Sequence, residues 1–284
     1  MVYLAAIPEL WSSRDDDDLS RFVLAARGHR LVPALHAIEG VSLDVAREDE
    51  RLLDGWAART ALRIPASGTS YRQGQARALA EVLGVELGFR GDAGDFHQPR
   101  SSHLHHVLGS RRGLPILLSA VWMDVGRRAG VTVDGVGIPG HYVVRVGGEG
   151  GVLCDPFEAG IPVSKEECRR RVRALTGGRL AWRDEFLDAQ TVPQLLERVL
   201  LNLLVAYRKE RDSRGEYRTA ALLAALLPDS AERQLQRADI ADQVGAREVA
   251  VAAWEEIVDR FPGSTEAETA AARLDAPAAS PPVN

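Results

Sequence analysis

Three short β-rich segments in the middle of the chain constrain its fold more than any other feature. They span residues 131–137, 141–146 and 152–154. Pro139-Gly140 separates the first two, and a turn over residues 147–151 that contains four glycines separates the last two. Short β-rich segments joined by such turns are typical of antiparallel strands. The sequence therefore predicts a small antiparallel sheet at the centre of the chain.

A helix is predicted immediately before these strands, over residues 116–129. Pro115 suits its first position, because the N–H that proline lacks would be unpaired there. Gly130 is placed to end this helix, and Ser102 is placed to cap a shorter helix that runs through Leu108. A helix followed by a meander of strands predicts an α+β fold.

Helical patterns flank this core on both sides. Apolar residues recur at helical spacing over residues 19–88, which predicts a helical N-terminal lobe. The acidic run at residues 15–18 is interpreted as a solvated helix start rather than a metal site, since carboxylates favour the positive end of a helix. Capping boxes are predicted at Ser164 with Glu167 and at Thr191 with Gln194.

The C-terminal part contains a weak repeat. Pro228 and Pro262 occupy matching turns 34 residues apart, which is the tetratricopeptide period. Two partial repeats are too few for a solenoid, so they are expected to pack on the long helix that begins near Thr191. The predicted division is a helical lobe over 1–90, a papain- or transglutaminase-like core over 91–190, a tetratricopeptide-like tail over 191–275 and a disordered end over 276–284.

Composition excludes several classes of partner. The 35 basic and 40 acidic residues give a net charge of −5 without a basic stripe, so no nucleic acid is expected to bind. No apolar run approaches the roughly 20 residues that cross a bilayer, and the first residues lack the basic part of an export signal, so no membrane association is expected. Two cysteines outside any dense framework indicate a reducing, cytoplasmic location.

His141 and Asp155 are the candidate catalytic residues. His141 opens one predicted strand and Asp155 follows the next, so antiparallel pairing can bring the two side chains together. An imidazole oriented by a carboxylate is two thirds of a Cys/His/Asp triad. The alternative is a structural hydrogen bond, which such pairs form more often.

Several motifs occur in order between residues 101 and 168, and together they strongly resemble the SirB-type family of the transglutaminase-like superfamily. The motifs are Arg112-Gly113-Leu114-Pro115-Ile116-Leu117-Leu118-Ser119, Gly135-Val136, Pro139-Gly140-His141-Tyr142, Asp155-Pro156-Phe157 and Gly160. The resemblance implies a papain-like triad with a Cys at the start of the central helix, a His on one strand and an Asp on the next. His141 and Asp155 match the last two.

The nucleophile departs from the superfamily pattern. Its Gly-x-Cys corresponds here to Gly113-Leu114-Pro115, and a proline cannot attack a carbonyl. The SirB-type relatives look similar in this respect, which implies that the family does not depend on cysteine for acyl transfer. Ser119, one turn further along the helix, is a weak substitute, with a buried and backbone-bonded serine as the alternative.

The remaining nucleophiles and ligands are expected to be structural. Strand alternation points Cys154 away from the side of Asp155, and Cys168 lies in a charged helical stretch with no identified base. The histidines at 97, 103, 105 and 106 could bind a metal, but without a Cys or an HExxH pattern they are expected to be exposed or capping residues. No cofactor and no metal are predicted.

These observations predict a non-catalytic protein-binding or adaptor module that recognises a protein or peptide partner. A papain-like cleft without its nucleophile still holds an extended groove, and repeat helices offer concave surfaces. The alternative is an amide hydrolase or acyl transferase in which His141 and Asp155 act with Ser119 or with water.

Overall fold

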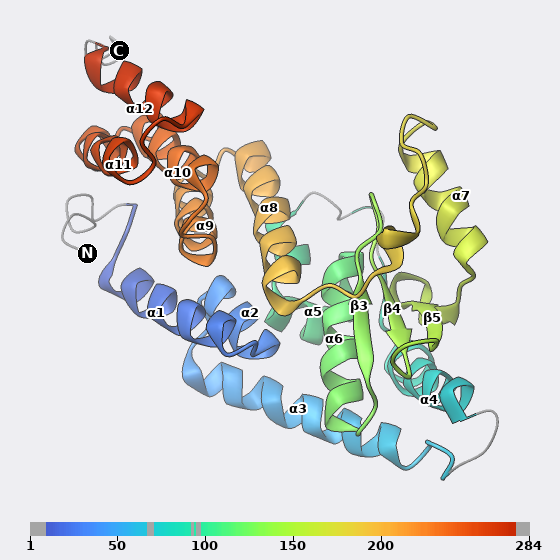
Figure 1. Ribbon diagram of the computed structural model, residues 1–284. Helices are drawn as coiled ribbons and strands as arrows, with labels where there is room; N and C mark the ends of the chain where they lie inside the picture. Colours follow the sequence, from blue (N-terminus) through green and yellow to red (C-terminus); the bar gives the residue numbers. More distant parts are fainter. Residues whose placement is uncertain (1–9, 67–70, 92–93, 95–97, 277–284) are drawn as a thin grey trace.

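The computed structural model describes residues 10–66, 71–91, 94 and 98–276, and the fold is α+β with helices on both sides of one small sheet (Figure 1). The helices are α1 (Ser13–Arg27), α2 (Leu31–Glu39), α3 (Leu43–Ala61), α4 (Tyr71–Leu79), α5 (Leu104–Ser110), α6 (Pro115–Arg128), α7 (Lys165–Leu175), α8 (Val192–Glu210), α9 (Ser213–Leu226), α10 (Ala231–Gln243), α11 (Arg247–Arg260) and α12 (Thr265–Asp275). A π-helical segment, Ala80–Glu86, extends α4.

The predicted antiparallel sheet is present. Its strands are β3 (Val133–Val136), β4 (Val143–Val146), β5 (Val152–Asp155) and β6 (Ile161–Pro162), paired in that order. A separate parallel pair joins β1 (Arg90–Gly91) to β2 (Arg112–Gly113). Because consecutive strands pair directly, the ends of β4 and β5 that carry the predicted site are neighbours in space.

Helix α6 is the central element of the fold and packs against β3 and β4 (Figure 1). Pro115 occupies its first position as predicted, and most of its residues are buried. Gly126 allows the close approach to β3, since a Cβ there would lie 2.3 Å from the Val133 side chain. The carboxyl end of α6 therefore faces the start of the sheet, and its amino end is left for the site.

The tail is a succession of packed helices. Helix α8 packs on α9, α9 on α10, α10 on α11 and α11 on α12, and α9 also contacts α1 (Figure 1). The capping box of Thr191 and Gln194 begins α8 as predicted. One continuous apolar core runs from Trp11 to Ala270, so the predicted lobe, core and tail share a core while their boundaries stay a prediction.

Two local predictions are wrong, and a third is not tested. His103 rather than Ser102 is the N-cap of α5, because residues 99–102 form a 3₁₀ turn of their own. Ser164 caps α7, but Glu167 bonds Arg170 and Arg171 instead of closing the box. The disordered end falls almost wholly on residues 277–284, which, like 1–9, lie outside the described residues.

The acidic run also differs from the prediction, because two of its carboxylates are buried. Asp15 and Asp18 are 5% and 2% exposed. Asp15 pairs with Arg214 at 2.8 Å and with Arg218 at 3.0 Å, and Asp18 pairs with Arg218 at 3.0 Å. These ion pairs join α1 to α9.

None of the helices among the described residues has the length and apolar character needed to cross a membrane.

Candidate functional site

The hydrogen bond predicted between His141 and Asp155 is present. Nε2 of His141 lies 2.9 Å from Oδ2 of Asp155, at the point where β5 ends. The other carboxylate oxygen accepts the backbone N–H of Phe157 at 2.9 Å. Gly140, with φ of +79°, makes the turn that delivers His141 to this position. Since an ionised carboxylate only accepts hydrogen bonds, Nε2 of His141 is the donor in this contact.

A third residue, Arg171 on α7, shares the same carboxylate. Its Nη1 donates to Oδ2 of Asp155 and lies 3.3 Å from Nε2 of His141. Burial of Asp155 opposes its ionisation, but the hydrogen bonds and charges of His141 and Arg171 outweigh burial and hold the pKa of Asp155 below its ordinary value. Asp155 is therefore an ionised, fully buried acceptor with three donors.

Sequence reasoning did not identify Arg171. It lies in a run of three arginines, and nothing in the run itself marks one of them. The buried residues of α7 could have done so, because Cys168 and Val172 define its inner face and Arg171 lies one turn from the first and beside the second.

Pro115 and His141 line one pocket of about 260 Å³ between the amino end of α6, the turn before β4, and α8. The residues that line it are Leu114, Pro115, Ile116, Gly140, His141, Tyr142, Arg198, Asn202, Val205 and Ala206. We call this pocket the cleft. A proline at the start of a helix thus shares a cavity with the histidine of a His–Asp pair.

Comparison with known proteins now decides the family. The profile described as "Transglutaminase-like superfamily" matches residues 48–201, which is more than half of the chain. The chain belongs to the transglutaminase-like superfamily. The match includes α6, the sheet, Asp155 and the first half of α8, so it contains all of the cleft residues except Asn202, Val205 and Ala206.

Relatives within the superfamily carry little functional description. A "UPF0162 protein" of Xylella fastidiosa strain 9a5c is 33% identical over 180 residues, which cover 60% of this chain and 62% of the relative, less than two thirds of its length. A "UPF0162 protein" of Vibrio cholerae is 23% identical over 252 residues, covering 86% and 93%. "F-box only protein 21" of Mus musculus is 28% identical over 142 residues, covering 47% and 22%. No solved structure matches.

The other residues that could replace the superfamily cysteine are poorly placed. Ser119 is fully buried and does not line the cleft. Its Oγ has no hydrogen-bond partner among the described residues, so the expectation of a backbone-bonded serine is wrong. Burial, together with the charge of Asp155, raises the pKa of Cys154 to about 12. Burial also raises the pKa of Cys168, which packs in a small apolar cluster with Ile138 and Val143.

The histidines near α5 have protein partners. His103 hydrogen-bonds to the Tyr207 hydroxyl at 3.2 Å. Nδ1 of His105 lies 3.0 Å from Asp49, which also bonds His36 at 3.0 Å, and this buried connection between α2, α3 and α5 was not predicted. The described residues contain no group of three or more His, Cys, Asp or Glu side chains arranged for a metal, and His97 lies outside them.

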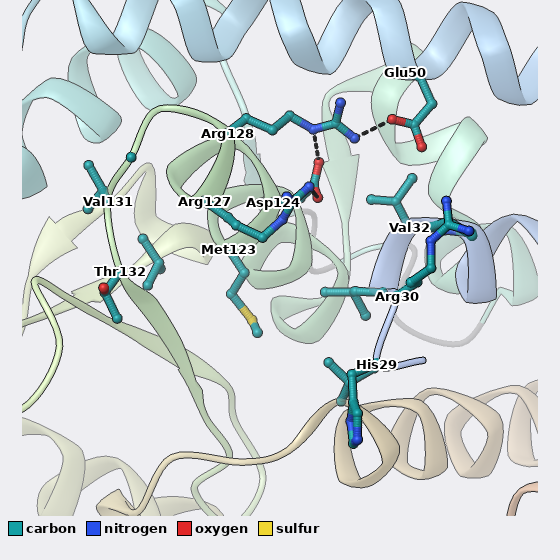
Figure 2. Close-up of a pocket in the computed structure, with 15 residues that line it drawn as sticks. His29, Arg30, Val32, Glu50, Met123, Asp124, Arg127, Arg128, Val131 and Thr132 are labelled. Carbon is teal, nitrogen blue, oxygen red and sulfur yellow. Dashed lines mark hydrogen bonds and ion pairs between the residues drawn. The ribbon is translucent and has the colours of Figure 1, made fainter. Parts of the chain in front are cut away.

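A larger pocket, of about 670 Å³, lies at the opposite end of α6. Figure 2 shows Arg128 bonded to Asp124 and Glu50 on one side of it, with His29 and Arg30 on the other. Arg128 also bonds Asp54, so it ties α3 to α6. This pocket is larger than the cleft, but His141, which bonds Asp155, lines the cleft, and we place the candidate site there.

Proposed function

We propose that this chain binds a protein or peptide partner in the cleft and does not carry out cysteine-dependent acyl transfer. One observation carries the proposal: Pro115 stands at the start of α6 in the same cavity as His141. Acyl transfer needs a nucleophile that can lose a proton to the histidine. A pyrrolidine ring offers neither a proton nor a lone pair, so His141 has nothing to activate there.

The surfaces of the cleft suit a peptide. Leu114, Val205 and Ala206 are apolar, and Val205 is 64% exposed although it lies beside a cavity. Arg198 and Asn202 on α8 add polar groups that could fix a peptide backbone. Apolar walls with a few convergent polar groups are typical of ligand sites.

The proposal also includes the type of family, the architecture of the tail and the location in the cell. The ordered motifs around His141 support a SirB-type member. The 34-residue spacing of Pro228 and Pro262 and the consecutive packing of α9 to α12 support a tetratricopeptide-like tail that offers a second protein-binding surface. The sparse, unpaired cysteines support a cytoplasmic location.

The test is a peptide-display selection on the whole chain, followed by binding measurements on two valine variants. Val205→Trp fills part of the cleft with a large uncharged side chain, and Val85→Trp places the same side chain on the π-helical segment, at a valine that is 76% exposed and lines neither pocket described above. Selected peptides should bind Val205→Trp at least about tenfold more weakly and Val85→Trp unchanged. Peptides that bind both variants like the parent chain would overturn a cleft-based function.

A second candidate function rests on the intact His141–Asp155 hydrogen bond. His141 could activate water, or Ser119, toward an amide or ester, because the bond to Asp155 uses Nε2 and leaves Nδ1 for a reacting group. A panel of acyl substrates tests this directly. Turnover that disappears in His141→Gln but survives in Ser119→Ala would indicate water as the nucleophile, whereas loss in both would assign Ser119. Either result replaces the binding function with an enzymatic one.

A further inference from the structure

Arg198 is a half-buried cation without a carboxylate partner. No Asp or Glu among the described residues forms an ion pair with it. Its Nη2 donates to the backbone oxygens of Ile138, at 3.0 Å, and His141, at 2.9 Å, and its guanidinium lies over the Tyr142 ring. Burial lowers the pKa of Arg198, and Tyr142 offsets this only in part.

Two other shielded arginines in this protein have carboxylate partners. Arg171, whose side chain is 25% exposed, pairs with Asp155, and Arg218, which is 16% exposed, pairs with Asp15 and Asp18. Removing a guanidinium from water without an opposite charge is costly, and protein folds usually supply one. The two carbonyls satisfy only one nitrogen of the Arg198 fork, which has five N–H donors.

The rest of the cleft also lacks negatively charged side chains. None of the residues that line it is acidic, while Arg198 and Asn202 can both donate. The amino end of α6, a helix of 14 residues, opens on it. Because Pro115 has no N–H, the first amide of that helix is Ile116, which lines the cleft and has no acceptor among the described residues. A helix start of this kind favours an anion.

We infer that the cleft recognises a carboxylate of the bound peptide, held between the free part of the Arg198 fork and the Ile116 amide. The inference rests on the proposed function and names the group that the site selects. A carboxylate has two coplanar oxygens that match a guanidinium edge, and its size suits a cavity of about 260 Å³. The carboxylate can come from a peptide C-terminus or from an Asp or Glu side chain.

Three small probes separate these sources on the full-length chain. N-acetyl-Ala-Ala has a free terminal carboxylate, N-acetyl-Glu-amide has only a side-chain carboxylate, and N-acetyl-Ala-Ala-amide has none. Each is titrated while the backbone amide resonance of Ile116 and the ring resonances of His141 are followed by NMR. At least one acidic probe should shift these resonances and bind about tenfold more tightly than the neutral amide.

Substitutions of Arg198 test whether this side chain binds the carboxylate. Arg198→Gln should weaken the acidic probe by about tenfold, and Arg198→Lys should recover part of the loss, because lysine keeps the charge without the fork. The matched control is Arg127→Gln on the larger pocket, where the side chain is 70% exposed, and it should change nothing. If Arg198→Gln does not fold, the comparison of acidic and neutral probes on the parent chain still decides.

Equal binding of acidic and neutral probes would overturn the inference, as would an acidic probe whose affinity depends on Arg127 instead of Arg198. The carboxylate site and the proposed peptide-binding function can be refuted independently. Display-selected peptides that are sensitive to Val205→Trp but indifferent to amidation of their carboxylates would refute the carboxylate site and leave the peptide cleft standing. An acidic probe that binds through Arg198 when no peptide binds the cleft would refute the peptide-binding function and leave the carboxylate site standing.

Discussion

Nε2 of His141 and Oδ2 of Asp155 lie 2.9 Å apart, and the Arg171 guanidinium bonds the same oxygen. Asp155 is fully buried, so its charge depends on both donors. The three side chains therefore hold β5, the turn before β4 and α7 together, whether or not they support chemistry.

Asp155→Asn should destabilise the fold by about 3 kcal/mol, because it leaves Arg171 beside a neutral amide in a shielded position. Chemical denaturation monitored by tryptophan fluorescence measures the loss. Asp184→Asn is the control, since Asp184 pairs with Lys165 at 2.6 Å on the surface and its removal should cost much less than that of Asp155. Similar losses in both variants would contradict the role given to the buried carboxylate.

The stability of the protein should fall between pH 6.5 and pH 4, and His103 should account for much of the fall. Burial, with the charges of Arg218 and His106, lowers the pKa of His103 from 6.5 to about 4. The unfolded chain therefore takes up a proton that the folded chain refuses, so stability is complete above pH 6.5 and decreases on acidification. At pH 5 the loss is about 2 kcal/mol.

His103→Gln should remove this part of the pH dependence, because glutamine can still bond Tyr207 but does not titrate. Denaturation midpoints at pH 7.5 and pH 5 give the difference. The exposed His29→Gln should leave the difference as it is in the parent chain. A parent-like difference in His103→Gln would mean that another group controls acid sensitivity.

A thiol introduced by Pro115→Cys should react with iodoacetamide faster than Cys154 or Cys168. It would stand at a helix start and share the cleft with His141, and both features favour the thiolate. The native cysteines are buried and their pKa values are raised. Mass spectrometry of the alkylated peptides ranks the three rates. An introduced thiol no faster than the native ones would show that position 115 is not the nucleophile position.

Arg218→Gln should cost about 3 kcal/mol, since it removes a partner from the buried carboxylates Asp15 and Asp18 together. Thermal unfolding should also become less cooperative between α1 and α9. Arg260→Gln is the matched variant, because Arg260 is 41% exposed and pairs with Glu256 within one helix. Equal melting temperatures for both variants would remove Arg218 from this role.

The sequence predicted the central elements because their signals are local. Pro115 and Gly130 mark the ends of α6, and the Gly-rich turns mark β4 and β5 within about two residues of their observed limits. The His141–Asp155 contact followed from strand pairing alone. Arg171 and Arg198 did not, because what each contacts depends on how α7 and α8 pack on the turn before β4, which no local pattern specifies.

The acidic run at residues 15–18 is a second case in which tertiary packing decides the environment of a side chain. Four carboxylates before a helix predict a solvated face, and Asp16 and Asp17 are exposed as expected. Asp15 and Asp18 are buried because Arg214 and Arg218 reach them from α9. Only the tertiary arrangement supplies these partners, so a rule based on neighbours in sequence assigned the wrong environment.

The contact between Asp15 and Arg218 spans 203 positions of the chain and has a consequence for the order of synthesis. While α9 is still untranslated, the arginine partners of Asp15 do not yet exist, whereas Asp18 already has Arg21 on its own helix. Helix α1 can pack on α2 early, but its contact with α9 can close only after α9 has left the exit tunnel. The joining of the N-terminal lobe to the tail is consequently a late event of biogenesis.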